Sequence, residues 1–283
     1  MPLYYDLGVM KEHEWVRASC GLFDVSHMGQ VMIKGAGALE FIEKLTPSNF
    51  STLAVGHTKY TVLTNEQGGI IDDLMVNHAG DEAWYLVINA GCKHKDMDWM
   101  KQHIPAGLEF TYFADWSLLA LQGPKAEEVL KAVVGMDASD MPYMSMRPHG
   151  DLYISRLGYT GEDGFEIAVH NDAAPALWDK LLANPAVKPI GLAARDSLRL
   201  EMGYALYGHD IDDKTSPVEA SMNWVLGKTR TEYFGSARIQ KELAEGPAKK
   251  FVGIKLIGAG VAREGSEIRN GSDQNVGVLT SGG

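Results

Sequence analysis

Two segments of the chain repeat one layout, a strand followed by a glycine turn and a short amphipathic helix. They are VMIKGAGALEFIEKL (31–45) and LLALQGPKAEEVLKAV (118–133), in which Gly35 corresponds to Gly123 and Ala38 to Ala126. This repeated pattern indicates two related strand–helix units. The block between them is expected to form a subdomain of its own.

The rest of the sequence contains patterns typical of strands and of helices. Alternating segments predict strands at 59–65 and 83–91. Helical spacing predicts helices at 93–103, 173–185 and 191–208, the second ended by Pro185 and the third with Arg195, Leu198, Arg199 and Met202 on one face. The short strands and turn signals in 251–260 and 270–283 indicate the beginning of an all-β unit.

Length and charge narrow the classes of function. A chain of 283 residues can hold two domains or more, and 37 acidic against 26 basic residues argue against a large nucleic-acid surface. Only Cys20 and Cys92 occur, without CxxC spacing, which argues against a disulfide framework or a thiolate metal site. The sequence has no membrane-length apolar run and no signal-peptide layout, so we expect an intracellular protein.

Several further motifs do not indicate a cofactor-binding, metal or nucleophilic site. Gly35 and Gly37 lack the third glycine of a dinucleotide fingerprint, and the nine histidines form no ligand spacing, so no metal is predicted. Cys20 is interpreted as a small buried residue. The basic segment 93–103 allows two interpretations, a solvated helix face or a surface for an anionic tail or an acidic partner.

Two adjacent carboxylates, Asp72 and Asp73, interrupt the apolar run GGIIDDLMV. Successive side chains of a strand point to opposite faces, so the two cannot share one role. A buried carboxylate needs a hydrogen-bond or charge partner, and the backbone of the preceding turn is a natural one. On spacing alone, both could be structural anchors.

Six blocks in order resemble the folate-binding aminomethyltransferase family, represented by the glycine cleavage system T-protein. The blocks are GLFDVSHMGQV (21–31), TNEQGGIIDDLMV (64–76), LALQGPKA (119–126), SRLGYTGEDGFEI (155–167), GLAARDSLRLEMGYALYGHDID (191–212) and SPVEASMNWVLGK (216–228). The resemblance spans nearly the whole chain. Family members usually extend beyond both of its ends, so the chain resembles a truncated version.

The resemblance implies a reaction in which an aminomethyl group moves from the lipoyl arm of the H-protein to tetrahydrofolate. Ammonia and 5,10-methylenetetrahydrofolate are then the products. The implied partners are lipoylated H-protein and tetrahydrofolate, with no metal, nucleic acid or membrane. The expected location is the cytoplasm of a bacterium or the mitochondrial matrix of a eukaryote.

The resemblance also implies roles for six residues. Asp73 matches the catalytic carboxylate, which leaves Asp72 a structural role. Glu166 matches the residue that grips the pterin, for which a carboxylate offers two acceptors. The remaining matches are tetrahydrofolate contacts: Tyr60, Tyr159, Arg195 and Met28, the last of which could equally be a plain core methionine.

The implied fold is α+β, with two mixed folate-binding subdomains and the beginning of a C-terminal β-barrel. The expected division is 1–30 with 113–235 as one discontinuous subdomain, 31–112 as the inserted second, and 236–283 as the incomplete barrel. Two alternatives remain open. One is a tetrahydrofolate-dependent demethylase of the same superfamily. The other is a non-enzymatic folate-binding assembly factor, although GYTGEDGFE lacks the cysteine of that factor's motif.

Overall fold

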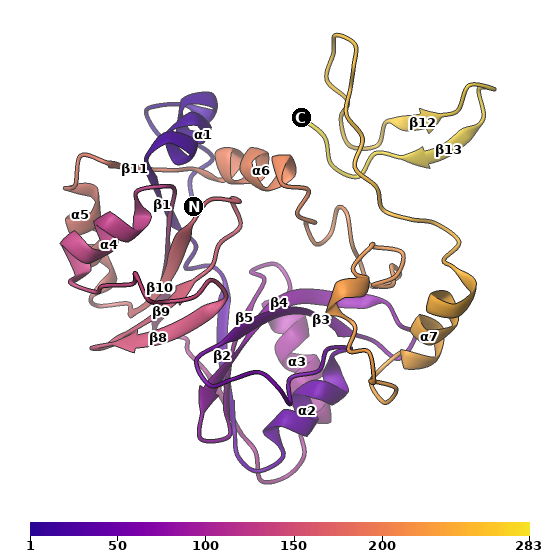
Figure 1. Ribbon diagram of the computed structural model, residues 1–283, viewed down its shortest axis with the longest axis horizontal. Helices are drawn as coiled ribbons and strands as arrows, with labels where there is room; N and C mark the ends of the chain where they lie inside the picture. Colours follow the sequence, from indigo (N-terminus) through magenta and orange to yellow (C-terminus); the bar gives the residue numbers. More distant parts are fainter.

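The computed structural model describes residues 1–283 and contains two main sheets flanked by helices (Figure 1). The first sheet has six strands in the order β11-β1-β7-β10-β9-β8, and only the β1–β11 pair is parallel. Its strands are β1 (Cys20–Asp24), β7 (Trp116–Gln122), β8 (Ser145–His149), β9 (Leu152–Arg156), β10 (Gly164–His170) and β11 (Val187–Pro189). The accompanying helices are α1 (Val9–Ala18), α4 (Ala126–Val134), α5 (Ala174–Leu182) and α6 (Leu192–Glu201).

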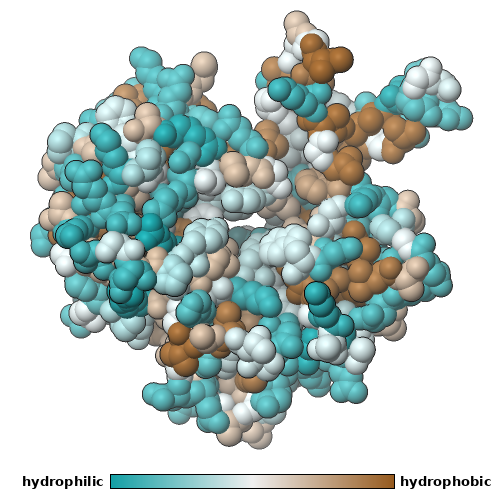
Figure 2. All heavy atoms as spheres, in the orientation of Figure 1, coloured by the Kyte–Doolittle hydropathy of each residue, from teal (hydrophilic) through white to brown (hydrophobic).

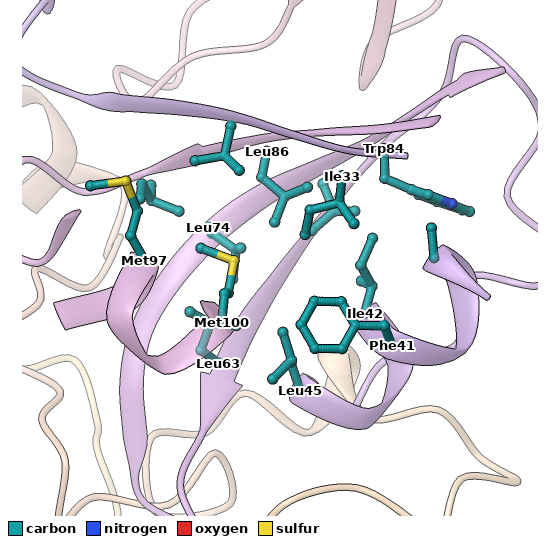
Figure 3. Packing of buried hydrophobic residues seen from close by; sticks show 14 of the residues in the cluster. Ile33, Phe41, Ile42, Leu45, Leu63, Leu74, Trp84, Leu86, Met97 and Met100 are labelled. Atoms are coloured by element: carbon teal, nitrogen blue, oxygen red, sulfur yellow. The ribbon is translucent and has the colours of Figure 1, made fainter. Parts of the chain in front are cut away.

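The second sheet has five antiparallel strands in the order β3-β4-β5-β2-β6. They are β2 (Gly29–Lys34), β3 (Thr58–Thr64), β4 (Ile70–Gly80), β5 (Ala83–Ile88) and β6 (Glu109–Tyr112). Helices α2 (Ala38–Leu45) and α3 (Lys93–His103) cover one face of this sheet, and their apolar side chains meet those of the strands (Figure 3).

The two predicted strand–helix units are confirmed as β2–α2 and β7–α4. Each turn needs a glycine, because Gly35 has φ 126° and Gly123 has φ 133°, in the region that side-chain-bearing residues avoid. At Gly123 a Cβ would also lie 2.3 Å from the carbonyl oxygen of Ser19. The repeated sequence pattern therefore reflects the same strand–turn–helix structure, which occurs once in each sheet.

The two sheets face each other across a shared core. In β5, Trp84, Leu86 and Ile88 pack against the helices, while Tyr85 and Val87 pack against Phe23, Leu118, Ala120 and Ala168 of the six-stranded sheet. A strand buried on both faces is expected to be a continuous apolar run, as AWYLVI is. The inter-sheet space is thus lined by one face of each sheet.

The chain after α6 crosses to the five-stranded sheet. Ala205, Ile211, Ala220, Met222 and Val225 pack with Val62 and Ile70 of β3 and β4. This segment holds η1 (Asn223–Val225), and α7 (Ser236–Glu245), β12 (Glu267–Arg269) and β13 (Asn275–Val278) follow it. The α+β class with a partly present C-terminal unit is therefore confirmed, whereas the division at 30, 112 and 235 stays a prediction.

The C-terminal part is sparsely packed. Its only strands form the two-stranded β12–β13 hairpin, drawn in yellow away from both main sheets in Figure 1. Val252, Ile254, Leu256 and Ile257 are exposed. The predicted helix over 191–208 is shorter than expected, because α6 ends at Glu201 and Gly203 follows with φ 69°. No helix of the chain is both long enough and apolar enough to cross a membrane.

Candidate active site

Asp72 and Asp73 face opposite sides of β4, as the strand period predicts. Leu74 and Val76, on the side of Asp72, pack with the helices, while Met75, on the side of Asp73, packs toward the six-stranded sheet. The alternation fails where the strand begins. There the register shifts between Leu63 and Thr64, and Ile71 packs in the helix-side cluster. Asp73 therefore points into the inter-sheet space.

Asp73 is half-buried and held by two donors. The Tyr60 hydroxyl donates to its Oδ2 at 3.1 Å, and Asn89 Nδ2 donates to its Oδ1 at 2.9 Å. Burial, followed by the negative charge of Asp72, raises the pKa of Asp73 to about 7, and the two hydrogen bonds oppose this rise. Asp73 is thus a carboxyl group that changes charge near neutral pH, as general acid–base chemistry requires.

Asp72 is fully buried, and the prediction that its hydrogen-bond partner is the backbone of the preceding turn was wrong. It accepts hydrogen bonds from the Asn89 backbone N–H and from Asn89 Nδ2, both at 3.0 Å, and not from the preceding turn. That turn is held by Asn65, whose side chain accepts from the N–H groups of Gln67 and Gly69. Because Asn65 already accepts these backbone N–H groups, the turn needs no acceptor from Asp72. Asp72 instead holds the loop that begins at Asn89.

The opposite wall carries Glu166 on β10 and Arg195 on α6. The side chain of neither residue makes a hydrogen bond or an ion pair within the chain, although both are half-buried. Burial raises the pKa of Glu166 to about 7, and the charge of Arg195 opposes this rise. Burial also lowers the pKa of Arg195, against the charges of Glu166 and Tyr159. Glu166 and Arg195 are therefore two half-buried charged groups whose hydrogen-bonding capacity the chain itself does not use.

Tyr159 joins Arg195 to the segment that follows α6. The Arg195 guanidinium lies over the Tyr159 ring at 4.8 Å, and the Tyr159 hydroxyl donates to the carbonyl of Ala205 at 2.6 Å. Burial and then the charge of Asp73 raise the pKa of Tyr159. The structure therefore brings five predicted residues to one region: Tyr60, Asp73, Tyr159, Glu166 and Arg195. Figure 2 shows that the molecule, in the orientation of Figure 1, is hollowed near its centre.

Met28 lies in a different setting. It is half-buried in the turn after β1 and packs against the core shared by the two sheets. Its assignment as a tetrahydrofolate contact stays a prediction.

Two contributors were missed by the sequence reasoning. Asn89 bridges Asp72 and Asp73, and Trp224 stacks on Tyr60 at 5.2 Å between ring centroids while 66% of its surface stays exposed. A polar residue that ends the apolar run AWYLVI, directly before a glycine-containing loop, was a usable signal for Asn89. Trp224 gave no such signal, because its partner lies 164 residues away in sequence.

A separate cavity of about 410 Å³ opens at the other end of the inter-sheet space. Met32, Phe113, Met146 and Tyr153 provide its apolar lining, and none of the predicted site residues lines it. The chain contains no cluster of three or more His, Cys, Asp or Glu side chains arranged to hold a metal ion.

Comparison with known proteins gives a consistent set of relatives. Residues 1–230 match the family described as the GCVT N-terminal domain. The aminomethyltransferase of Flavobacterium psychrophilum is 43% identical over 291 residues, which cover 100% of this chain and 80% of the relative. The mitochondrial aminomethyltransferase of Dictyostelium discoideum is 44% identical over 306 residues, covering 100% and 75%.

A solved structure shares the whole fold. The crystal structure of glycine cleavage system aminomethyltransferase T from Bartonella henselae superposes with a TM-score of 0.96 at 38% identity, covering 100% of this chain and 79% of the other. Similarity of this extent over the complete chain includes both sheets and the C-terminal hairpin.

Proposed function

Because this chain belongs to the glycine cleavage T-protein family of aminomethyltransferases, we propose that it transfers an aminomethyl group from the lipoyl arm of an H-protein to tetrahydrofolate. In this reaction N5 of the pterin bonds to the methylene carbon as the carbon–sulfur bond breaks, and sulfur keeps the electron pair as a thiolate. N10 then displaces ammonia, which gives 5,10-methylenetetrahydrofolate. We place the reaction in the cytoplasm of a bacterium or the mitochondrial matrix of a eukaryote.

The observation that carries this proposal is the half-buried Asp73, held by Tyr60 and Asn89 on the face of β4 that lies toward the six-stranded sheet. Positive charge develops on the methylene carbon and its nitrogen as sulfur leaves. A carboxylate beside this centre stabilises that charge and relays protons, and it does so most strongly where water is excluded. No nucleophilic side chain is needed, because the pterin nitrogen supplies the new bond.

The proposed role gives turnover a defined pH dependence. The pKa of Asp73 is raised to about 7, so the group is protonated below that pH and ionised above it. Since the ionised form is the active one, kcat/KM should rise with pH through about 7 and level off. A profile measured from pH 5 to 9 checks this, and a flat profile would contradict it.

Burial raises the pKa of Glu166 to about 7 as well, so a control variant must separate the two groups. Glu166→Gln keeps the shape of the side chain and removes its charge. If Asp73 carries the profile, this variant should retain the rise near 7 with weaker tetrahydrofolate binding. Loss of the rise in Glu166→Gln would assign the titration to Glu166.

We propose that Glu166 and Arg195 recognise the pterin. Glu166 has two acceptor oxygens without protein donors, and the pterin offers a ring N–H and an amino group in matching positions. Tyr60 stacks on Trp224, and Tyr159 stacks on Tyr204, so flat aromatic surfaces border both walls. Such surfaces suit a flat bicyclic ring. Met28 contributes apolar surface in this proposal.

Glu166→Ala should weaken tetrahydrofolate binding roughly 10- to 100-fold, the value of about 1.5–3 kcal/mol for hydrogen bonds to a charged group. Titration calorimetry on the ligand-free protein measures this. Glu128→Ala is the matched control, because Glu128 is an exposed carboxylate on α4, outside the inter-sheet space. Equal affinities for the wild type and Glu166→Ala would show that the pterin binds elsewhere.

The decisive test is to mix the full chain with aminomethylated H-protein and tetrahydrofolate and to follow methylenetetrahydrofolate. Product formation that depends on both substrates is the expected result. If no product forms while a small methylated amine or sulfonium donor reacts with tetrahydrofolate, the donor side of the proposal is wrong and the chain is a demethylase.

A further inference from the structure

One buried glutamine, Gln122, holds the loop that carries Tyr159. This loop spans residues 157–163 and joins β9 to β10. Gln122 is the last residue of β7, and 1% of its surface is exposed. Its Nε2 donates to the Leu157 carbonyl at 3.0 Å, and its Oε1 accepts from the Thr160 hydroxyl at 2.9 Å. The same amide therefore fixes the chain both before and after Tyr159.

The partners of Gln122 allow only one orientation of its amide. The Leu157 carbonyl can only accept a hydrogen bond, so the NH₂ end must face it, and the oxygen end faces Thr160. Thr160 has no exposed surface, and its side-chain oxygen also accepts the Glu162 N–H at 3.2 Å. Loss of either bond to Gln122 would leave a buried polar group without that partner.

Two glycines of the segment GYTGEDGFE allow this close contact. A Cβ on Gly158 or on Gly164 would overlap the side-chain amide of Gln122. The φ of Gly158 is not in the left-handed region, so the close approach is what requires a glycine there. A glycine directly before Tyr159 also gives the backbone conformational freedom, which the two hydrogen bonds of Gln122 restrict.

The other end of Tyr159 is fixed as well. Its hydroxyl donates to the Ala205 carbonyl at 2.6 Å, and its ring stacks on Tyr204 at 5.8 Å between centroids. The Arg195 guanidinium lies over this ring at 4.8 Å and makes no hydrogen bond within the chain. The position of the Tyr159 ring therefore helps to set where the charge of Arg195 lies.

We propose that Gln122 and Thr160 are positioning residues, whose shared hydrogen bond holds Tyr159, and through its ring Arg195, in the arrangement that binds tetrahydrofolate. This inference rests on the proposed function, in which Tyr159 and Arg195 contact that substrate. Gln122 and Thr160 are too deeply buried to touch it themselves. Their role is thus in substrate binding and not in the chemistry at Asp73.

Substitution of Thr160 tests this role. Thr160→Val keeps the shape of the side chain and removes the hydroxyl that donates to Gln122. Kd and KM for tetrahydrofolate should rise about 10-fold, the scale of one buried hydrogen bond, while kcat at saturating tetrahydrofolate stays near the wild-type value. Thr160→Ser keeps the hydroxyl and should restore most of the affinity. Gln122→Met, of similar length without the amide, should weaken binding at least as much as Thr160→Val.

A matched control separates positioning from stability. Thr46 is 1% exposed, and its hydroxyl donates to the Ile42 carbonyl at 2.9 Å at the end of α2. Thr46→Val removes a comparable buried hydrogen bond outside the inter-sheet space. It should lower the free energy of unfolding, as Thr160→Val does, but leave Kd for tetrahydrofolate unchanged.

Titration calorimetry with tetrahydrofolate on the ligand-free full chain measures Kd, and the H-protein assay measures kcat and KM. Wild-type affinity in folded Thr160→Val would overturn the inference even if Gln122→Met does not fold. A loss of affinity in Thr160→Ser or Thr46→Val equal to that in Thr160→Val would also overturn it, as would a fall in kcat without a rise in KM. A wild type that binds no tetrahydrofolate would instead overturn the proposed function, and this inference with it.

Discussion

Asp73→Asn should lower kcat for aminomethyl transfer by about 10²- to 10⁴-fold, the contribution of a positioned acid–base group. The amide has the shape of the carboxylate and can still accept the hydrogen bond from Tyr60. It lacks the charge that stabilises the developing cation and cannot relay a proton. Stability and tetrahydrofolate affinity should therefore change little, while turnover in the H-protein assay falls.

A matched control is available on the same strand pair. Asp81 is an exposed aspartate in the β4–β5 turn with φ 48°, a conformation that asparagine tolerates well. Asp81→Asn should therefore leave turnover unchanged. Near-normal turnover in Asp73→Asn, with aminomethylated H-protein as donor, would remove Asp73 from the chemistry.

Tyr60→Phe refines the same assignment. It deletes the hydroxyl that donates to Asp73 and keeps the ring that stacks on Trp224. Since that hydrogen bond lowers the pKa of Asp73, its loss should move the rise in the pH profile to higher pH. An unshifted profile would mean that Tyr60 does not act through the carboxylate.

Local rules in the sequence predicted the parts of the site that depend on neighbours along the chain. Strand alternation separated Asp72 from Asp73, and the glycine turns predicted the two strand–helix units. The partner of Asp72 could not be obtained in this way. Asn89 lies 17 residues further on, and only the pairing of β4 with β5 brings it alongside.

The second wall depends even more on tertiary structure. Glu166, Tyr159 and Arg195 come from β10, the loop before it and α6, and their spacing carries no signal of a shared site. The family resemblance suggested them, and the packing of the two sheets explains why they converge. Glu166 alternates with the buried Phe165 and Ile167, so it must point away from the helix-side core and toward the five-stranded sheet.

Arg199→Met should lower the free energy of unfolding by about 3–5 kcal/mol, because it leaves a buried charge without its partner. Arg199 Nη1 lies 2.8 Å from Asp210 Oδ2, and both side chains are almost completely buried. The same guanidinium also donates to Tyr204, Asp196 and Ser281. Urea unfolding followed by circular dichroism measures the change.

The size of this effect depends on burial and not on the ion pair as such, and a second pair tests that reasoning. Arg147 and Asp140 are 2.9 Å apart at an exposed site, where water screens both charges, so Arg147→Met should leave the free energy of unfolding almost unchanged. Asp210→Asn combined with Arg199→Met removes the unpaired charge and should recover part of the loss. If the double variant is no more stable than Arg199→Met alone, the cost arises from lost packing and hydrogen bonds to Tyr204 and Ser281, and not from the charge left on Asp210.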